Sequence, residues 1–268
     1  MLIDIGVNLS SSRFSGDIES VLLRAEQSNV KKIIITGTSI TETETCIELC
    51  EKYESQFPRM LYATAGIHPH EASSFSNSAI NAIAHFAQHP SVVAIGETGL
   101  DFYRNFSPEK MQERAFEAQI ELAITCQLPL FLHERDASKR QLEILKSYQN
   151  TLPKAVIHCF TGDKKTLFNY LDLDLYIGIT GWICDERRGG DLQNIVKNIP
   201  LNRLMVETDA PYLLPRNMPQ PPKNRCNEPA NLTYVIEGIA AHREESVTML
   251  AESSSATAIE FFNLGSWT

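Results

Sequence analysis

The chain has 268 residues, 43% of them hydrophobic, and carries a formal net charge of −9. This composition fits a globular protein with a sizeable core, and the acidic balance excludes a surface coated for non-specific nucleic-acid binding. The apolar runs fall far short of the ~20 residues of a membrane helix, residues 1–4 lack the basic segment of a signal peptide, and the cysteines are scattered, so we expect a cytoplasmic protein without membrane contact.

Short apolar runs alternate with longer amphipathic runs along the chain. The short runs predict strands that begin near Leu2, Lys32, Leu61, Val92, Pro129, Ala155, Leu175 and Leu204. The longer runs predict helices over 17–28, 42–54, 109–126 and 137–148, and a further C-terminal helix within 244–262. Asp17 and the pair Ser107-Pro108 are the predicted helix caps.

This alternation predicts an α/β fold, a (β/α)8 TIM barrel that forms a single domain over residues 1–268, with the C-terminal helix closing the barrel. The strands are hydrophobic enough to be buried on both faces. A doubly wound open sheet is the alternative. It is less favoured because polar residues follow nearly every strand instead of gathering at one switch point.

Five of these strands end in a titratable side chain. The residues are His68, Glu97, His133, His158 and Asp209. Because the carboxyl ends of barrel strands meet at one face, Glu97, His133, His158 and Asp209 should converge there. Buried carboxylates repel one another unless a cation compensates them, and two imidazoles complete a ligand set for a divalent ion. One histidine alone would more often be an ordinary core residue, but the joint pattern indicates a metal-dependent hydrolase.

Several short motifs carry a family resemblance that spans nearly the whole chain. They lie at 66–70, 96–101, 129–136, 158–162, 207–212 and 227–229. In these motifs the chain resembles the TatD family of metal-dependent deoxyribonucleases, which are amidohydrolase-like barrels. The resemblance implies that His68 lies at the substrate phosphate, and that the metal ligands are Glu97, His133, His158 and Asp209.

The chain departs from the family on its first strand. Most members carry an Asp-x-His-x-His motif, whereas this chain has Gly6 and Asn8 at the two histidine positions. Glycine offers no ligand atom and asparagine a weak one. We therefore expect one tight divalent site and a second, weaker site shared between Glu97 and Asp209. Imidazole ligands favour Zn or Mn, whereas the chemistry of the family is linked to Mg, so the identity of the ion stays open.

The expected reaction is attack of a metal-activated water on a phosphodiester. Asp209 is predicted to take the proton from that water, and His68 to stabilise charge on the phosphate oxygens. Glu207, one layer deeper, either orients a metal ligand or pairs with a neighbouring Arg or Lys.

Arginines and aromatic residues in the predicted loops after the strands could bind the substrate. The predicted substrate-binding residues are His70, Arg104, Arg135 and Trp182. Arg135 follows His133 in phase, and Trp182 is the preferred residue for stacking a base. Phe102 and Phe106 are equally well explained as packing against the barrel rim.

These features predict a monomeric nuclease that hydrolyses DNA, with a 3′-5′ exonuclease action on single strands or frayed ends. RNA as a substrate and an endonuclease action stay open. One alternative is a metal-dependent hydrolase of an ester or amide, such as an aminoacyl-tRNA, because a fold does not determine its chemistry. The other is a degenerate barrel that binds nucleic acid without cleaving it, because both first-strand histidines are missing.

Overall fold

The computed structural model describes residues 1–265, and its eight parallel strands pair in chain order. The strands are β1 (Leu2–Val7), β2 (Val30–Ile35), β3 (Leu61–Ala65), β4 (Val92–Asp101), β5 (Leu130–Arg135), β6 (Ala155–Ile157), β7 (Tyr176–Ile179) and β8 (Leu204–Val206). A parallel bridge between Val7 and Ala210 joins β1 to the segment after β8, so the sheet closes on itself. The predicted TIM barrel is confirmed, and every strand begins within two residues of its predicted start.

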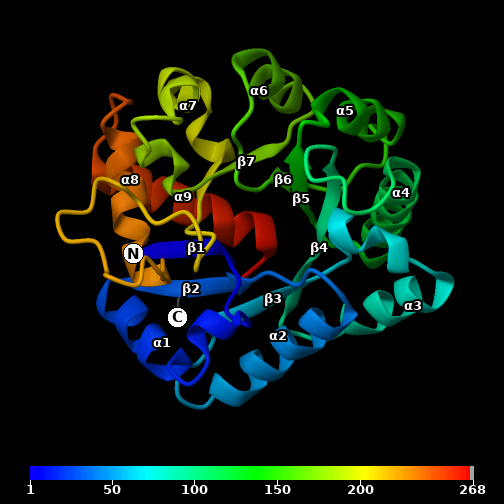
Figure 1. Cartoon of the computed structure of the whole chain (residues 1–268), viewed down its shortest axis with the longest axis horizontal. Helices are drawn as coiled ribbons and strands as arrows, with labels where there is room; N and C mark the ends of the chain where they lie inside the picture. Colours follow the sequence, from blue (N-terminus) through cyan, green and yellow to red (C-terminus); the bar gives the residue numbers. More distant parts are fainter. Residues whose placement is uncertain (266–268) are drawn as a thin grey trace.

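Helices surround the strands (Figure 1). The α-helices are α1 (Ile18–Gln27), α2 (Ile40–Tyr53), α3 (Asn77–Phe86), α4 (Glu109–Cys126), α5 (Ser138–Ser147), α6 (Lys164–Leu171), α7 (Gly190–Ile195), α8 (Leu232–Ala240) and α9 (Val247–Phe262). Short 3-10 turns lie at Ser12–Phe14, Pro69–Ser74, Gly181–Cys184, Val196–Asn198, Leu201–Arg203 and Pro229–Asn231. Among residues 1–265, no helix has the length and apolar character needed to cross a membrane.

Successive side chains of each strand point to opposite faces, which divides the core into two layers. On β5, Leu130 and Leu132 pack outward with the helices, whereas Phe131 packs inside the barrel with residues such as Ile5 and Met205. Both faces of a parallel strand are thus buried, which explains the almost continuous apolar runs. Because His133 follows Phe131 by two positions, its side chain also turns toward the barrel axis.

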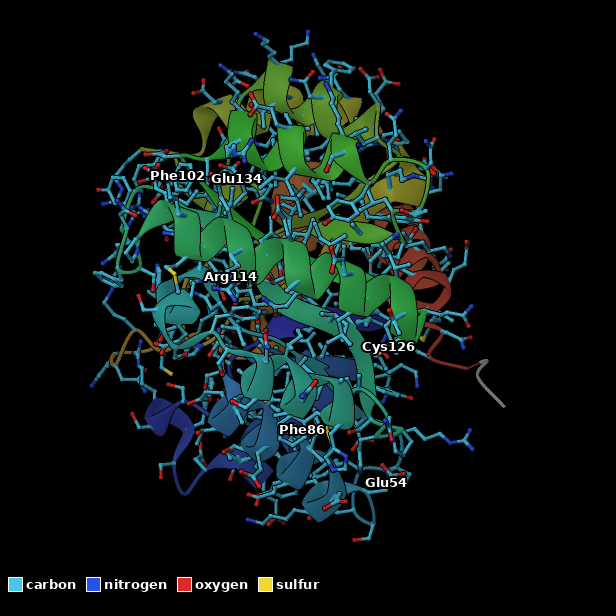
Figure 2. All side chains as sticks on the ribbon, turned by 90° about the vertical axis from the view of Figure 1, so that its right-hand side faces the viewer. Glu54, Phe86, Phe102, Arg114, Cys126 and Glu134 are labelled. Atoms are coloured by element: carbon cyan, nitrogen blue, oxygen red, sulfur yellow. The ribbon has the colours of Figure 1, made fainter. Side chains whose placement is uncertain are left out.

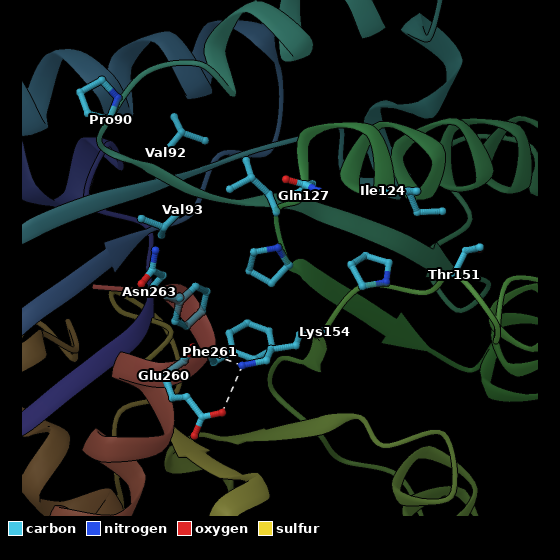
Figure 3. A pocket seen from close by; sticks show the side chains of 14 residues that line it. Pro90, Val92, Val93, Ile124, Gln127, Thr151, Lys154, Glu260, Phe261 and Asn263 are labelled. Carbon is cyan, nitrogen blue, oxygen red and sulfur yellow. Dashed lines mark hydrogen bonds and ion pairs between the residues drawn. The ribbon is translucent and has the colours of Figure 1, made fainter. Parts of the chain in front are cut away.

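Helix α9 closes the barrel at the amino ends of its strands, as predicted. Figure 1 shows this helix in red beside β1. Phe261 on α9 is buried, and its ring centroid lies 4.8 Å from that of Tyr176 at the start of β7. A cavity of about 590 Å³ opens at this end (Figure 3), and its titratable side chains within residues 1–265 are Lys154 and Glu260, which pair at 3.2 Å. This cavity lies at the opposite end of the barrel from the residues predicted to carry the chemistry.

The two predicted helix starts are confirmed, because Asp17 and Pro108 stand at the N-cap positions of α1 and α4, but neither side chain makes a capping hydrogen bond. Asp17 stands at the N-cap of α1, but its side chain makes no capping bond and instead pairs with Arg24 at 3.0 Å. At α4 the N-cap position is Pro108, which has no capping side chain. The buried Ser107 hydroxyl donates to the His70 carbonyl at 2.8 Å, so tertiary contact takes this side chain away from the helix end.

Candidate active site

The predicted site residues gather at the carboxyl ends of the strands. Glu97 lies in β4 and His133 in β5, whereas His68, His158 and Asp209 follow β3, β6 and β8. Figure 2 labels Phe102 and Glu134 near each other at one end of the molecule, and Cys126, the last residue of α4, at the other. β4 and β5 thus deliver their last residues to the same face, where active sites of barrel enzymes lie.

The carboxylate of Glu97 is the centre of this cluster. Its Oε1 atom lies 2.8 Å from His158 Nε2, 2.9 Å from His133 Nδ1 and 3.3 Å from His68 Nε2. The side chain of Glu97 is 8% exposed. Three imidazoles from three different strand ends therefore converge on one buried oxygen atom.

Two of these imidazoles each contact a second carboxylate through the ring nitrogen that faces away from Glu97. His133 Nε2 lies 3.3 Å from Asp101 Oδ2, and His158 Nδ1 lies 3.4 Å from Glu207 Oε2. A carboxylate that accepts the N–H of one ring nitrogen leaves the other nitrogen with a free lone pair. This is the arrangement that orients metal-binding histidines. His133 Nδ1 and His158 Nε2, which both face Glu97, are therefore the atoms suited to hold a metal.

In His68 the hydrogen-bonding roles of the two ring nitrogens are reversed relative to the Glu97 side. Its Nδ1 atom accepts the backbone N–H of His70 at 3.1 Å, so in the neutral ring the hydrogen sits on Nε2. The Nε2–H then donates toward Glu97. His68, Glu97 and His133 each offer an atom within 4.8 Å of the others and could hold an ion by proximity alone. The hydrogen bond at Nδ1 makes His68 a hydrogen-bond donor at this face instead.

Burial and charge shift the titration of the cluster. Burial lowers the pKa of His68 to about 4, so the ring stays neutral. Burial alone would raise the pKa of Glu97, but His158, His68 and His133 hold it well below its usual value. Burial opposes charge on His158 too, yet Glu97 and Glu207 raise its pKa well above the ordinary value. The site thus concentrates negative charge that protons or a divalent cation can neutralise.

Asp209 lies on the β1 side of the cluster. Its Oδ1 atom accepts the side-chain N–H of Asn8 at 3.0 Å, and its backbone N–H donates to the Gly6 carbonyl at 2.9 Å. Burial raises the pKa of Asp209 to about 7. The two first-strand positions that lack histidine thus position Asp209 instead of supplying imidazoles.

Gly6 has a further structural role. A Cβ atom at this position would lie 2.3 Å from Glu207 Oε2, far inside contact distance. Glu207 is fully buried, and its other oxygen accepts the backbone N–H of Cys159. Of the two interpretations of Glu207, its contact with His158 supports the orienting role. The absence of a side chain at Gly6 provides the space that the Glu207 carboxylate occupies.

The predicted substrate-binding residues lie on loops around the site. The ring of His70 is 4.2 Å from that of His68, and its Nε2 atom lies 2.7 Å from Asp101 Oδ2. The guanidinium of Arg135 covers the Tyr103 ring at 4.1 Å. Arg104 is exposed, and its backbone N–H donates to Asp101.

Trp182 is half-buried, and the guanidinium of Arg188 covers its ring at 4.3 Å. Arg187 and Arg188 both pair with the buried carboxylate of Asp185, at 2.9 and 3.0 Å. The carboxylate of Asp185 therefore partly compensates the positive charge of this loop. The guanidinium of Arg188 occupies one face of the Trp182 indole.

Sequence reasoning did not assign a role to Asp101, which binds both His70 and His133. One signal was available, because Glu97, Gly99 and Asp101 alternate on one strand and so share a face. The hydrogen bonds of Asp101 cross 31 and 32 residues of sequence, so they became visible only in the folded chain.

The barrel and its histidine–carboxylate cluster together define a hydrolase of the metal-dependent barrel class. The chain belongs to the TatD related DNase family, whose sequence model matches residues 3–263. It is 46% identical over 263 residues to the 3′-5′ ssDNA/RNA exonuclease TatD of Salmonella typhimurium, covering 98% of this chain and 99% of that relative. The protein of the same description from Pectobacterium carotovorum is 47% identical, with 98% and 100% covered.

Solved structures agree with this assignment. A TatD homologue from Escherichia coli superposes with a TM-score of 0.88 at 28% identity, and the match covers 98% of both chains. A TatD family hydrolase from Entamoeba histolytica superposes with a TM-score of 0.89 at 26% identity, again over 98% of both chains. The predicted family is therefore confirmed.

Proposed function

We propose that this protein is a metal-dependent 3′-5′ exonuclease that removes nucleotides from single-stranded DNA and RNA, with residues 1–268 acting as one hydrolase domain. Membership of the TatD related DNase family and the description of the curated relatives support the reaction and the substrate. The observation that carries the proposal is the hydrogen bonding of His133 and His158. Each ring has one nitrogen beside a second carboxylate, Asp101 or Glu207, and its other nitrogen within 2.9 Å of Glu97 Oε1.

In this proposal Glu97, His133, His158 and Asp209 are the ligands for divalent metal ions. When bound, the ion supplies positive charge that polarises the phosphodiester and lowers the pKa of a water molecule. Asp101 and Glu207 hold the two ligand histidines in the required orientation. His68, neutral and with its hydrogen on Nε2, donates to a non-bridging phosphate oxygen.

Asp209 is the proposed base that takes the proton from the attacking water. Asn8 holds its Oδ1 atom at 3.0 Å, which leaves Oδ2 for the proton. Arg104, Arg135, His70 and Trp182 are the proposed substrate-binding residues around this centre. We further propose that the protein acts as a monomer and, in line with its free cysteines, in the cytoplasm.

Two metal sites of unequal affinity follow from the first strand. Gly6 has no ligand atom, and the Asn8 amide is already bonded to Asp209. We therefore propose one tight site at Glu97, His133 and His158, and a weaker one between Glu97 and Asp209. Titration of the metal-free protein with Mn²⁺ and Zn²⁺ should resolve two unequal steps, and two equally tight steps would contradict this assignment.

The proposed activity is tested on single-stranded DNA labelled at its 5′ end, with Mg²⁺, Mn²⁺ and Zn²⁺ in parallel. The wild type should shorten the strand stepwise from the 3′ end, and a chelator should abolish the reaction. Asp209→Asn should keep the fold and lose about 100-fold or more in rate, the scale of general-base catalysis. Wild-type rates in that variant would remove Asp209 from the mechanism. Cleavage that persists in the chelator would overturn the metal-dependent reaction.

A further inference from the structure

The loop between β4 and α4 holds a phenylalanine in solvent beside the proposed active site. Phe106 is 66% exposed, more than any other large hydrophobic side chain in the described part of the chain. Two further exposed aromatic residues, Tyr103 and Tyr212, lie on loops at the same end of the barrel, at 60% and 53%. Leaving a phenyl ring in water forgoes the free energy of its burial, so a functional reason is expected.

The backbone around Phe106 is fixed. On one side, the side chain of Asn105 accepts from Gln112 Nε2 at 3.3 Å. On the other, the buried hydroxyl of Ser107 donates to the His70 carbonyl at 2.8 Å and accepts the Ser73 backbone N–H at 2.9 Å. The exposed ring therefore sits on a loop that is hydrogen-bonded on both sides, so little ordering entropy would be lost when a ligand packs against it.

A series of ring contacts connects Phe106 with the Glu97 cluster. Its centroid is 4.7 Å from that of His70, which it meets at 62°, and the His70 ring is in turn 4.2 Å from His68. His68 reaches Glu97 Oε1 at 3.3 Å. Two histidine rings thus link Phe106 to the Glu97 cluster, where the proposed reaction takes place.

Two other aromatic residues of the mouth, Tyr103 and Trp182, are less free to stack a base. A guanidinium covers the ring of Tyr103 and another covers the ring of Trp182, at 4.1 and 4.3 Å. Trp182 also packs against the hydrophobic core. Phe106 instead contacts the ring of His70 at an angle of 62°, and 66% of its surface is exposed.

We propose that Phe106 is the stacking platform for the base of the 3′-terminal nucleotide. The inference rests on the proposed exonuclease function and adds the residue that selects unpaired ends. Every base offers a π-face, so stacking on phenylalanine tolerates any sequence, as a general exonuclease requires. A base inside a duplex is already stacked and paired, so only a single-stranded or frayed end can place its last base on this ring.

The test uses two oligonucleotides that differ only in the 3′-terminal nucleotide, which carries a base in one and is abasic in the other. The readout is the ratio of their kcat/KM values with saturating metal ion. Wild type should prefer the substrate with the base by about 5- to 150-fold, the scale of one base–aromatic stack. Phe106→Ala should reduce this ratio toward one, and Phe106→Trp should retain it. A general loosening of the loop would slow both substrates equally and cancel in the ratio.

Phe168→Ala is the matched control, because Phe168 on α6 is also exposed, at 41%. It should leave the ratio and both rates unchanged. A wild-type ratio near one, or an unchanged ratio in Phe106→Ala, would overturn the stacking role while cleavage itself continues. Failure of wild type to cleave either substrate with metal would instead overturn the proposed function.

Discussion

Replacing Glu207 by glutamine should weaken metal binding without unfolding the protein. Glutamine keeps the volume that fills the space over Gly6. Its oxygen can still accept the Cys159 N–H, which leaves the amide N–H₂ facing His158 Nδ1. His158 Nδ1 must then accept a hydrogen bond from this amide. The hydrogen of the His158 ring therefore moves to Nε2, the atom that faces Glu97. If the amide turns around, the Cys159 N–H loses its acceptor, at a cost of about 1–3 kcal/mol.

The expected loss of metal affinity is about 10- to 100-fold, the usual effect of removing a carboxylate behind a metal-binding histidine. This corresponds to roughly 1.4–2.7 kcal/mol of binding free energy. Isothermal titration of the metal-free protein with Mn²⁺ measures it, and circular dichroism checks the fold. Asp185→Asn, which changes a carboxylate of another loop, is the control and should bind as wild type does. Wild-type affinity in folded Glu207→Gln would refute the orienting role of this residue.

Three further predictions concern stability. Gly6→Ala should cost about 1–3 kcal/mol in urea unfolding, because its Cβ would lie 2.3 Å from Glu207 Oε2, and adding Glu207→Ala should recover part of that loss. An undiminished stability of Gly6→Ala would show that the carboxylate moves freely. Burial raises the pKa of Asp4 from 3.8 to about 8, so the folded state binds the extra proton and stability should fall as pH rises through this window. The free energy of unfolding of the wild type should fall by at most about 1.4 kcal/mol per pH unit more than that of Asp4→Asn. Parallel curves of unfolding free energy against pH for the two proteins would contradict this. Phe261→Ala should cost about 3–5 kcal/mol of unfolding free energy and leave metal affinity intact, since the ring packs at the far end of the barrel; a loss of metal affinity in the folded variant would show that the two ends are coupled.

The elements and the members of the site could be predicted from the sequence because both depend on local pattern. Continuous apolar runs mark strands that are buried on both faces, and the helical runs between them leave few other folds. His133 was identifiable because it directly follows such a run, and Asp209 because it lies three residues after one. The helix starts were predicted at the right residues, but the capping bonds do not form, because local side-chain preferences do not reveal competing partners. Asp17 bonds Arg24, and Ser107 bonds a loop 37 residues away.

The sequence by itself determined the barrel, the family and, apart from Asp101, the histidines and carboxylates at the strand ends. Only the tertiary structure decided which group each ring nitrogen faces. That choice depends on Asp101 behind His133, on Glu207 behind His158 and on a backbone N–H beneath His68. These bonds form between side chains whose meeting is set by how the strands pack, so residue spacing holds no record of them. The physical reason is that a hydrogen bond is decided within a few tenths of an ångström, whereas hydrophobic pattern places a residue only on a face.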